Sequence, residues 1–442
     1  MKLKLLTLLL ALSFSQINAQ KALLQSGPMV GYSEMLEVML WAQTTEAAEV
    51  KINYTAKDNS ENSFWTNTVK TCKEKAFTAH LLADSVSPGT EYEYTVYINN
   101  QPVELDYECR FETLPIWKWR GDPPAFSFAS GSCAYINEER FDRPGKGYGG
   151  DYRIFESIAE KSPDFMLWLG DNNYLREPDW NTRRGIQHRN THTRSTKELQ
   201  ALLAKMHHYA IWDDHDYGPN NSNKSYIMKD VTLEVFKQFW ANPSYGTDNM
   251  PGAISYFNWN DCDFFLLDNR FYRDANYLKG DNKTILGEKQ KEWLKNALVF
   301  SHANFKFVAI GGQFLNDAGF YETHANYGFN PEREELINFI QEHNIKNVVF
   351  ITGDRHHSEI SVLEEPGKPT IHDITTSPLT AGPARVNPDE NNSLRIKDSF
   401  ISGQRNYALF NVSGKDDNRT VEVKFYDSDG KELYQYQIKK EN

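Results

Sequence analysis

Five segments of the chain place metal-binding residue types at the ends of short apolar runs. The clearest is Gly170-Asp171-Asn172-Asn173-Tyr174, because the run before it, Phe165 to Leu169, is too short to be anything but a buried strand. Open sheets bind ligands at the carboxyl ends of their strands, so the pattern predicts a metal pocket of the kind used in hydrolysis. The other segments are Ser132-Cys133, Trp212-Asp213-Asp214-His215-Asp216, Gly311-Gly312-Gln313 and Gly353-Asp354-Arg355-His356-His357.

The first residues have the layout of a secretory signal peptide. Lys2 and Lys4 precede an apolar run from Leu5 to Phe14, and Asn18-Ala19 follows before Gln20. The alternative is an uncleaved anchor helix, but the run is shorter than the roughly 20 apolar residues of a membrane span. No later segment is long and apolar enough to cross a bilayer. We therefore expect cleavage of residues 1–19 and an exported protein, periplasmic or secreted.

Charge and length limit the classes of function. The formal net charge is -12, which argues against nucleic acid as a stable partner, because phosphate backbones require clustered Lys and Arg. A small phosphorylated substrate is still compatible, since a metal centre can supply local positive charge. At roughly 100 to 200 residues per domain, the chain is long enough for two or three domains.

The four cysteines do not form a dense disulfide framework. Cys72 and Cys109 lie in the same early region and could pair in an oxidising compartment, a question that the sequence leaves open. Cys262 lies in a predicted strand and is expected to be a small core residue. Cys133 is different, because it follows a strand directly.

Residues 23–114 are predicted to form a β-sandwich of the immunoglobulin or fibronectin III sort. Short runs alternate apolar and polar residues without a helical stripe, and Asn99-Asn100 gives a hairpin turn signal. Such a module could bind sugars or a partner protein, or it could be a scaffold beside an enzyme, which is the interpretation we favour. The clearest strands are residues 37–41, 49–54, 77–81 and 92–98.

Residues 125–442 alternate predicted strands with predicted helices, which indicates a layered α/β domain. The final strands are expected to complete a second sheet rather than a separate domain. The predicted strands are 125–129, 165–169, 209–212, 263–267, 305–310, 347–352, 407–412, 420–426 and 432–439, and the predicted helices are 151–161, 195–208, 287–301 and 331–343.

Asp171 and Tyr174 lie in one loop and can present a carboxylate and a phenol to the same ion. A phenol ionises near neutral pH only beside a strongly acidic cation, which favours ferric iron. Cys133 would add a thiolate, which favours iron or zinc over alkaline-earth ions. Taken singly, a buried Tyr or Cys is more often a packing residue.

Two further loops strengthen the metal interpretation. The four ionisable residues from Asp213 to Asp216 follow an apolar strand and would be costly there without cations. Asp354 and His356 are separated by one residue, so in an extended segment their side chains project to the same side. The alternative is that these acids cap helices or form surface salt bridges. Several such loops after several strands favour a shared metal site.

From about Phe126 to Val412 the chain resembles the PhoD-type alkaline phosphatases of the calcineurin-like metallophosphatase superfamily, relatives of the purple acid phosphatases. The resemblance covers most of the predicted catalytic region, in the family's order. The segments that carry it are residues 131–133, 170–174, 212–216, Leu267-Asp268-Asn269-Arg270-Phe271-Tyr272-Arg273, Leu286-Gly287-Glu288-Lys289-Gln290, 311–313 and 353–356.

The resemblance implies a four-layer α/β/β/α core with two mixed sheets and a metal centre of two or more ions. An iron site would use Cys133, Asp171, Tyr174 and His356. A second site would share Asp171 and add Asp214 and Asp354, with Gln313 nearby and Asn220 and Asn221 as further oxygen donors. Oxygen ligands favour Ca2+ at that second site, although Zn2+ or Mn2+ occurs in the wider superfamily.

Two cations held close together would also give roles to nearby side chains. His215 would hydrogen-bond the phosphate or protonate the departing alkoxide. Arg270 would hold phosphate oxygens, with Arg273 as the weaker candidate. The alternative for Arg270 and Arg273 is an ion pair with Asp268, Asp274 or Glu288 that orders the loop.

The sequence therefore predicts an exported metal-dependent phosphoesterase acting on phosphate monoesters and some diesters. One rival is a phosphodiesterase or phospholipase of the same fold with a wider, more apolar groove. The other is a binding or adhesion protein whose metal centre is structural. Aromatic residues in irregular segments could stack on a substrate or pack a loop against its domain; they are Trp117, Trp119, Trp180, Tyr321, Tyr327 and Phe329.

Overall fold

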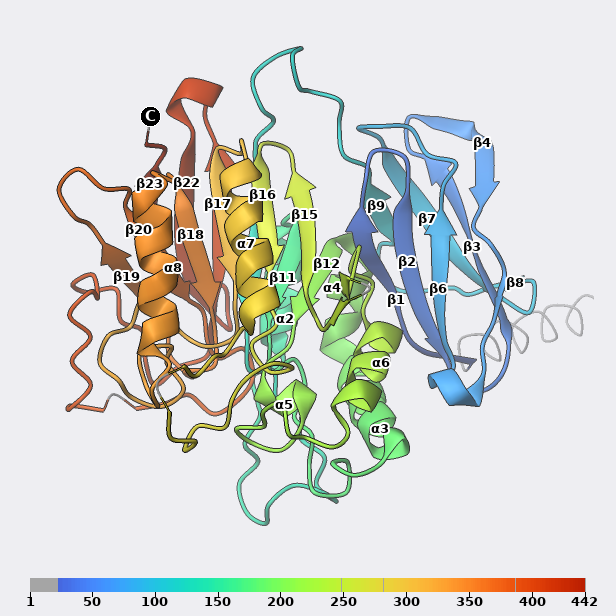
Figure 1. Cartoon of the computed structure of the whole chain (residues 1–442). Coiled ribbons are helices and arrows are strands. Elements are labelled where there is room, and N and C mark those ends of the chain that lie inside the picture. Colours follow the sequence, from blue (N-terminus) through green and yellow to red (C-terminus); the bar gives the residue numbers. More distant parts are fainter. Residues whose placement is uncertain (1–22, 248, 281, 386, 442) are drawn as a thin grey trace, which may run out of the picture. The chain divides into compact units, whose positions relative to one another are not determined.

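The computed structural model describes residues 23–247, 249–280, 282–385 and 387–441. The predicted signal peptide lies outside these residues. The chain divides into two compact units. The small unit holds the described residues up to Ile116 with Arg194–His208 and Gln238–Ala241, and the large unit holds Trp117–Thr193, Tyr209–Lys237 and the described residues from Asn242 onward. Figure 1 colours the chain from blue to red along its length.

The small unit is built from two antiparallel sheets that share one core. Along β7, every second residue from Tyr92 to Ile98 is buried, as expected for a strand with one face on a core. These residues pack with Leu40 and Leu81 of the other sheet. The first sheet contains β1 (Leu24–Ser33), β2 (Val38–Thr44) and β6 (Thr78–Ala83), and the second contains β3 (Glu49–Ala56), β4 (Asn59–Trp65), β5 (Val69–Lys70), β7 (Glu91–Ile98), β8 (Gln101–Pro102) and β9 (Arg110–Glu112). α4 (Gln200–Lys205) also belongs to this unit.

The first sheet of the large unit is mixed. Its strands run in the order β23-β22-β21-β10-β11-β12, with β10 and β11 parallel and β10 and β21 antiparallel. All five residues of β11 are buried, which explains its uninterrupted apolar sequence. The strands are β10 (Phe126–Gly131), β11 (Phe165–Leu169), β12 (His207–Ile211, of which residues 209–211 belong to this unit), β21 (Asn406–Ser413), β22 (Thr420–Asp427) and β23 (Glu432–Lys439).

The second sheet of the large unit is also mixed, so the mixed sheets predicted from the sequence are confirmed. Four central strands are parallel, and the two edge strands are antiparallel to their neighbours. In spatial order the strands are β15 (Ser255–Trp259), β16 (Cys262–Leu266), β17 (Phe305–Ala309), β18 (Val348–Thr352), β20 (Ile371–Thr375) and β19 (Glu359–Leu363). A separate short hairpin pairs β13 (Gly246–Thr247) with β14 (Met250–Pro251).

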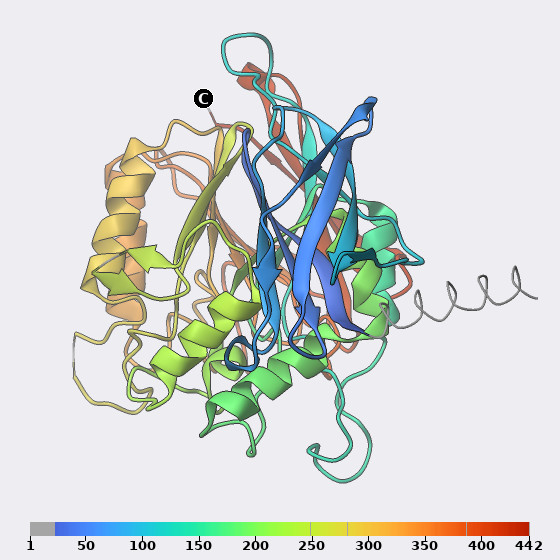
Figure 2. The same cartoon turned by 90° about the vertical axis from the view of Figure 1, so that its right-hand side faces the viewer.

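The two sheets of the large unit face each other across an aromatic core. The ring of Phe128 in the first sheet lies 5.3 Å from those of Phe264 and Phe307 in the second. α7 (Glu288–Phe300) and α8 (Asn330–Glu342) pack on the outer face of the second sheet, as Figures 1 and 2 show. α2 (Arg153–Lys161) covers the outer face of the first, where Phe155 contacts Trp168. Among the described residues, the other α-helices that lie mostly in this unit are α3 (Arg183–Arg194), α5 (Asp214–Tyr217) and α6 (Lys229–Phe239).

One prediction about local structure was wrong. The helix expected over residues 195–208 ends at Lys205; Met206 is extended, and His207 and His208 are buried in β12 instead of ending a helix. The strands from Asn406 onward extend one of the two sheets of the large unit and do not form a separate unit, because β21 pairs along β10 from Phe126 to Ser130.

Two expectations concern export and cysteine pairing. Within the part of the chain that the structure describes, no helix combines the length and the apolar character that crossing a membrane would require. Cys72, Cys109, Cys133 and Cys262 are all free thiols.

Candidate metal centre

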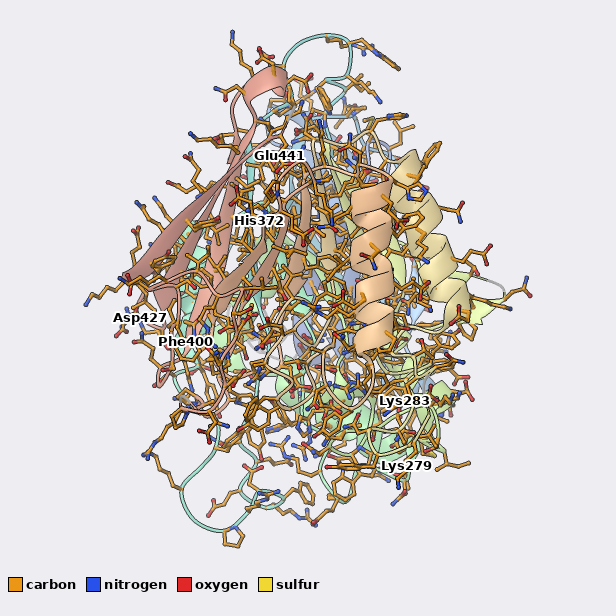
Figure 3. The ribbon with its side chains drawn as sticks, turned by 60° about the vertical axis from the view of Figure 1, so that its left-hand side comes forward. Lys279, Lys283, His372, Phe400, Asp427 and Glu441 are labelled. Carbon is orange, nitrogen blue, oxygen red and sulfur yellow. The ribbon has the colours of Figure 1, made fainter. Side chains whose placement is uncertain are left out.

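The loops that follow four strands of the large unit bring the predicted metal ligands together. Cys133 follows β10, Asp171 and Tyr174 follow β11, Asp214 begins the short helix after β12, and Asp354 and His356 follow β18. Although two different sheets supply these strands, the loops meet at one cavity. β18 begins away from this cavity. Asn347, directly before β18, accepts a hydrogen bond from the Glu441 backbone N–H. Figure 3 shows Glu441 toward the other end of the large unit from Phe400, which lines the cavity.

The four residues predicted to hold iron are neighbours. Cys133 Sγ lies 3.7 Å from Asp171 Oδ2, and the Tyr174 hydroxyl lies 3.3 Å from His356 Nε2. One ligand atom from each of Cys133, Asp171 and His356 lies within 4.8 Å of the other two. All four side chains can therefore approach a single ion.

The predicted second site adjoins the first. Ligand atoms of Asp171, Asp214 and His215 lie within 4.8 Å of one another, and so do those of Asp213, Asp214 and Asp354. Asp171 belongs to two of the three overlapping groups, and so does Asp214. The six predicted ligands therefore form one continuous cluster rather than two isolated sites.

The ligand loops have unusual backbone conformations. Cys133, Asp171, Asp354 and His356 have φ values of 61°, 51°, 66° and 55°. Residues other than glycine avoid this left-handed region, at a cost of about 1–3 kcal/mol each, and such residues concentrate at functional sites. The fold therefore holds four of the six predicted ligands in conformations that the free chain would disfavour.

Two glycines allow these loops to approach one another. A Cβ atom on Gly170 would lie 2.7 Å from the backbone nitrogen of Asp213, and one on Gly353 would lie 2.6 Å from Ser132 Oγ. Gly170 also has a φ of 93°, which glycine adopts without steric cost. Any side chain at these positions would separate the loops that carry the ligands.

Burial makes the cluster electrostatically costly. Burial, and then the charge of Asp214, raise the pKa of Asp171 well above its usual value. Burial, and then Asp213, raise the pKa of Asp354 to about 7, and burial with Asp354 raises the pKa of Cys133 to about 12. Burial also raises the pKa of Tyr174. In the absence of a cation, these groups resist ionisation because like charges are close and water is excluded.

The side-chain oxygens of the cluster fit one or more bound metal ions. Asp213 Oδ2 and Asp214 Oδ1 are buried and have no hydrogen-bond partner among the residues that the structure describes, and an unsatisfied buried carboxylate oxygen is expensive. Burial would raise the pKa of Asp214, but His215 and Arg270 hold it below its usual value, so this carboxylate is ionised. A cation at the cluster would satisfy the oxygens and offset the repulsion.

His215 follows Asp214 directly in the short helix α5. Its side chain lines the cavity, and its ring centroid is 4.3 Å from that of Tyr174. Its backbone N–H donates to Asp171 Oδ1 at 3.2 Å. The same short helix thus carries a predicted ligand, Asp214, and a cavity-facing imidazole.

Arg270 forms ion pairs with partners that the sequence did not indicate. Its side chain is fully buried, pairs with Asp213, and places Nη2 2.7 Å from Glu322 Oε2 and 3.9 Å from Asp214 Oδ1. It is not among the residues that line the cavity. The structure thus forms the ion-pair alternative, although not with Asp268, Asp274 or Glu288.

Gln313 and the two asparagines have different positions. Gln313 donates to Glu359 and Thr375 and accepts from Arg355 at 2.5 Å, so protein partners satisfy its amide. It is not among the residues that line the cavity, although its partner Arg355 is. Asn220 and Asn221 do line the cavity, and the Asn221 backbone N–H donates to Asp214 Oδ2 at 2.6 Å.

Two of the clustered acids have a structural role. Asp213 and Asp216 form a capping box at the start of α5. The Asp213 side chain accepts a hydrogen bond from the Asp216 backbone N–H, and the Asp216 side chain accepts one from the Asp213 backbone N–H. The helix-capping alternative thus holds for these two residues. It does not account for Asp214, whose carboxylate faces the cluster.

Sequence reasoning missed two residues beside the cluster. The Tyr148 hydroxyl lies 3.1 Å from His356 Nδ1, which also lies 2.6 Å from the Gly382 carbonyl oxygen. Glu322 lines the cavity and pairs with Arg270. Both occur in irregular segments without a preceding apolar strand, so the pattern that revealed the other residues was absent.

The cluster lies in a cavity of about 1250 Å³. Aromatic and basic side chains form much of the wall beyond the acidic cluster. They include Trp180, Tyr321, Tyr327, Arg143, Lys146, Arg355 and Arg385.

Comparison with solved structures shows that the fold is one found in phosphatases. A structure of PhoD aligns with a TM-score of 0.74 at 20% identity and covers 95% of this chain and 92% of that one. A purple acid phosphatase, PPD1, from yellow lupin (Lupinus luteus) seeds aligns with a TM-score of 0.68 at 11% identity and covers 94% of this chain and 74% of that one.

The chain belongs to the PhoD-like phosphatase family, whose model matches residues 128–415. Residues 21–116 match a domain of unknown function, DUF7800. Alkaline phosphatase D of Bacillus subtilis (strain 168) is 28% identical over an alignment of 336 residues, and the match covers 65% of this chain and 54% of that protein. The chain therefore matches about half the length of this curated relative.

Proposed function

We propose that the protein is an exported metal-dependent phosphoesterase that hydrolyses phosphate monoesters. The observation that carries the proposal is the convergence of Cys133, Asp171, Tyr174, Asp214, Asp354 and His356 in one cluster, in which every residue except Cys133 also lines the cavity. Membership of the PhoD-like family supports the same reaction class. Export is supported by the signal-peptide pattern of residues 1–19.

The donor types support Fe3+ beside Ca2+. Cys133, Asp171, Tyr174 and His356 would hold the iron, because thiolate and phenolate suit a strongly acidic ion. Asp171, Asp214 and Asp354 would hold calcium through oxygen. When bound, such a group supplies positive charge to the oxygens of a phosphate ester and activates water for hydrolysis.

In this proposal the protein supplies proton transfer and rigidity. His215 hydrogen-bonds the phosphate or gives a proton to the departing alkoxide oxygen, as its place in the cavity allows. Arg270 acts from behind the site as a positioning residue, because it holds Asp213 and Glu322. The small unit, with its two sheets on one core, is an immunoglobulin- or fibronectin-like scaffold.

Metal analysis tests the proposal directly. Native protein should contain iron and calcium and should show a visible absorption band from phenolate or thiolate bound to iron. Tyr174→Phe should weaken or shift this band, because the variant loses only the phenolic oxygen. Elemental analysis and an absorption spectrum check both points. Native protein with stoichiometric zinc and no visible band would contradict the assignment of iron.

The size of the cavity favours a second candidate, a phosphodiesterase of the same fold. About 1250 Å³ exceeds the space that a phosphate group needs. Initial rates on nitrophenyl phosphate and on bis-nitrophenyl phosphate separate the candidates, and we expect the monoester to be hydrolysed faster. A higher rate on the diester would favour the phosphodiesterase or phospholipase alternative.

A further inference from the structure

An exposed tyrosine lines the cavity beside the metal centre. The side chain of Tyr321 is 55% exposed, and its φ of 49° lies in the left-handed region, which is rare for a bulky residue. A tyrosine that only packed its loop would bury its ring. Exposure together with an unfavourable backbone conformation indicates that the ring is kept available for a ligand.

Neighbouring contacts fix the backbone at Tyr321 and in the residues that follow it. The Asn326 side chain donates to the Tyr321 carbonyl oxygen at 2.6 Å, and the His324 backbone N–H donates to the Gln313 carbonyl oxygen at 2.9 Å. Glu322, the next residue, points inward to Arg270. The ring is therefore presented from an ordered segment, so that stacking on it costs little conformational entropy.

The ring also adjoins the residues of the metal centre. The guanidinium of Arg355 lies 4.8 Å from the Tyr321 ring centroid. Arg355 stands between Asp354 and His356 in the sequence, and its own position is fixed by an ion pair with Glu390 at 2.8 Å. A planar group on Tyr321 would therefore lie close to a phosphate bound at the cluster.

The other residues of the cavity wall suit a ligand that carries both an aromatic ring and a phosphate group. Trp180 and Tyr327 add further aromatic surface. Arg143, Lys146 and Arg385 also line the cavity, and none of the three has an ion-pair partner among the described residues. These cations stand out in a chain of net charge -12, and they would attract a phosphate dianion.

We propose that the cavity selects nucleoside 5′-monophosphates, with the base stacked on Tyr321 and the phosphate at the metal centre. This inference rests on the proposed function and names its substrate class. In the reaction, water oxygen bonds to phosphorus as the bond from phosphorus to O5′ breaks. A proton of the water goes to O5′, and the products are the nucleoside and inorganic phosphate.

Adenosine 5′-monophosphate and ribose 5-phosphate provide a matched test, because both release a primary alkoxide oxygen and only one carries a base. The wild-type protein should hydrolyse the nucleotide with a kcat/KM about tenfold higher, given the usual strength of stacking between a base and an aromatic side chain. Tyr321→Leu should reduce the ratio of the two kcat/KM values toward one. Tyr321→Phe keeps the ring and should keep the ratio.

Phe300→Leu is the control, because Phe300 is 81% exposed at the end of α7 and does not line the cavity. It should leave both rates unchanged. Equal kcat/KM values for the two substrates in the wild type, or an unchanged ratio in Tyr321→Leu, would overturn the inference while leaving the phosphoesterase proposal intact. Failure of the metal-loaded wild type to hydrolyse either compound would instead contradict the proposed function, and the inference with it.

Discussion

Replacing Asp171 with Asn should lower kcat for a nitrophenyl phosphate monoester by at least about 1000-fold, because metal assistance contributes several kcal/mol to such reactions. Asp171 contributes ligand atoms to two of the overlapping groups, and its carboxylate lies 3.7 Å from the Cys133 thiol. Asn keeps the size of the side chain and removes its charge. Initial rates, together with the metal content of the purified variant, check this result.

Glu177→Gln is the matched control for Asp171→Asn. Glu177 also lines the cavity, but it is exposed and is not one of the clustered donors. Its substitution removes one negative charge from the same cavity and should change kcat less than about threefold, as expected for a surface substitution. Unchanged hydrolysis in Asp171→Asn would favour the binding or adhesion alternative, in which the metal centre is structural.

Replacing Arg270 with Met should destabilise the protein by about 3–5 kcal/mol, because removing one partner leaves the other buried charges uncompensated. Arg270 is fully buried and neutralises Asp213 and Glu322, with Asp214 at 3.9 Å. Met fills much of the space without supplying charge. Equilibrium unfolding in urea, with circular dichroism as the signal, measures the change in the free energy of unfolding.

Arg153→Met is the corresponding surface control. Arg153 pairs with Asp429 at 3.0 Å, but the side chains are 59% and 73% exposed. Such pairs contribute less than about 1 kcal/mol, so the control should be nearly neutral. Equal stability losses in the two variants would show that Arg270 does not have the positioning role proposed for it.

The sequence predicted the donors that follow strands. The apolar run before Gly170 is buried along all five residues of β11, and the loop after it carries Asp171 and Tyr174 as expected. The regularity of parallel strands makes this possible, since their carboxyl ends must lie along one edge. The same argument placed Cys133 beside them, whereas His356 follows β18 of the second sheet, so its position depends on how the two sheets face each other.

The sequence could not predict which polar groups pair behind the site. Arg270 forms its ion pairs with Asp213 and Glu322, which are 57 and 52 residues away in the sequence, rather than with acids closer to it in the sequence. Such pairing depends on the packing of irregular loops, for which no periodic pattern exists. The amide of Gln313 was likewise satisfied by Glu359 and Arg355, which belong to other loops and strands.

Polar helices and local strand formation escaped prediction for related reasons. α3 has no apolar stripe, because one buried position is Arg189, which pairs with Asp179 and Glu138. Periodicity therefore gave no signal. At His207 the chain becomes a strand although the preceding residues have a helical pattern. The reason is that β12 pairs with neighbouring strands, and such pairing depends on tertiary structure.

The candidate metal ligands and part of the cavity wall come from different segments of the chain, which matters for engineering this protein. The candidate ligands stand directly after β10, β11, β12 and β18, whereas Tyr148, Tyr321 and Arg385 of the wall come from separate irregular segments. Transplanting those segments from a relative would therefore alter which esters are accepted while the donor set remains in place. In proteins with this arrangement, the choice of ligand can therefore change through substitutions in the wall segments while the metal-binding residues stay the same.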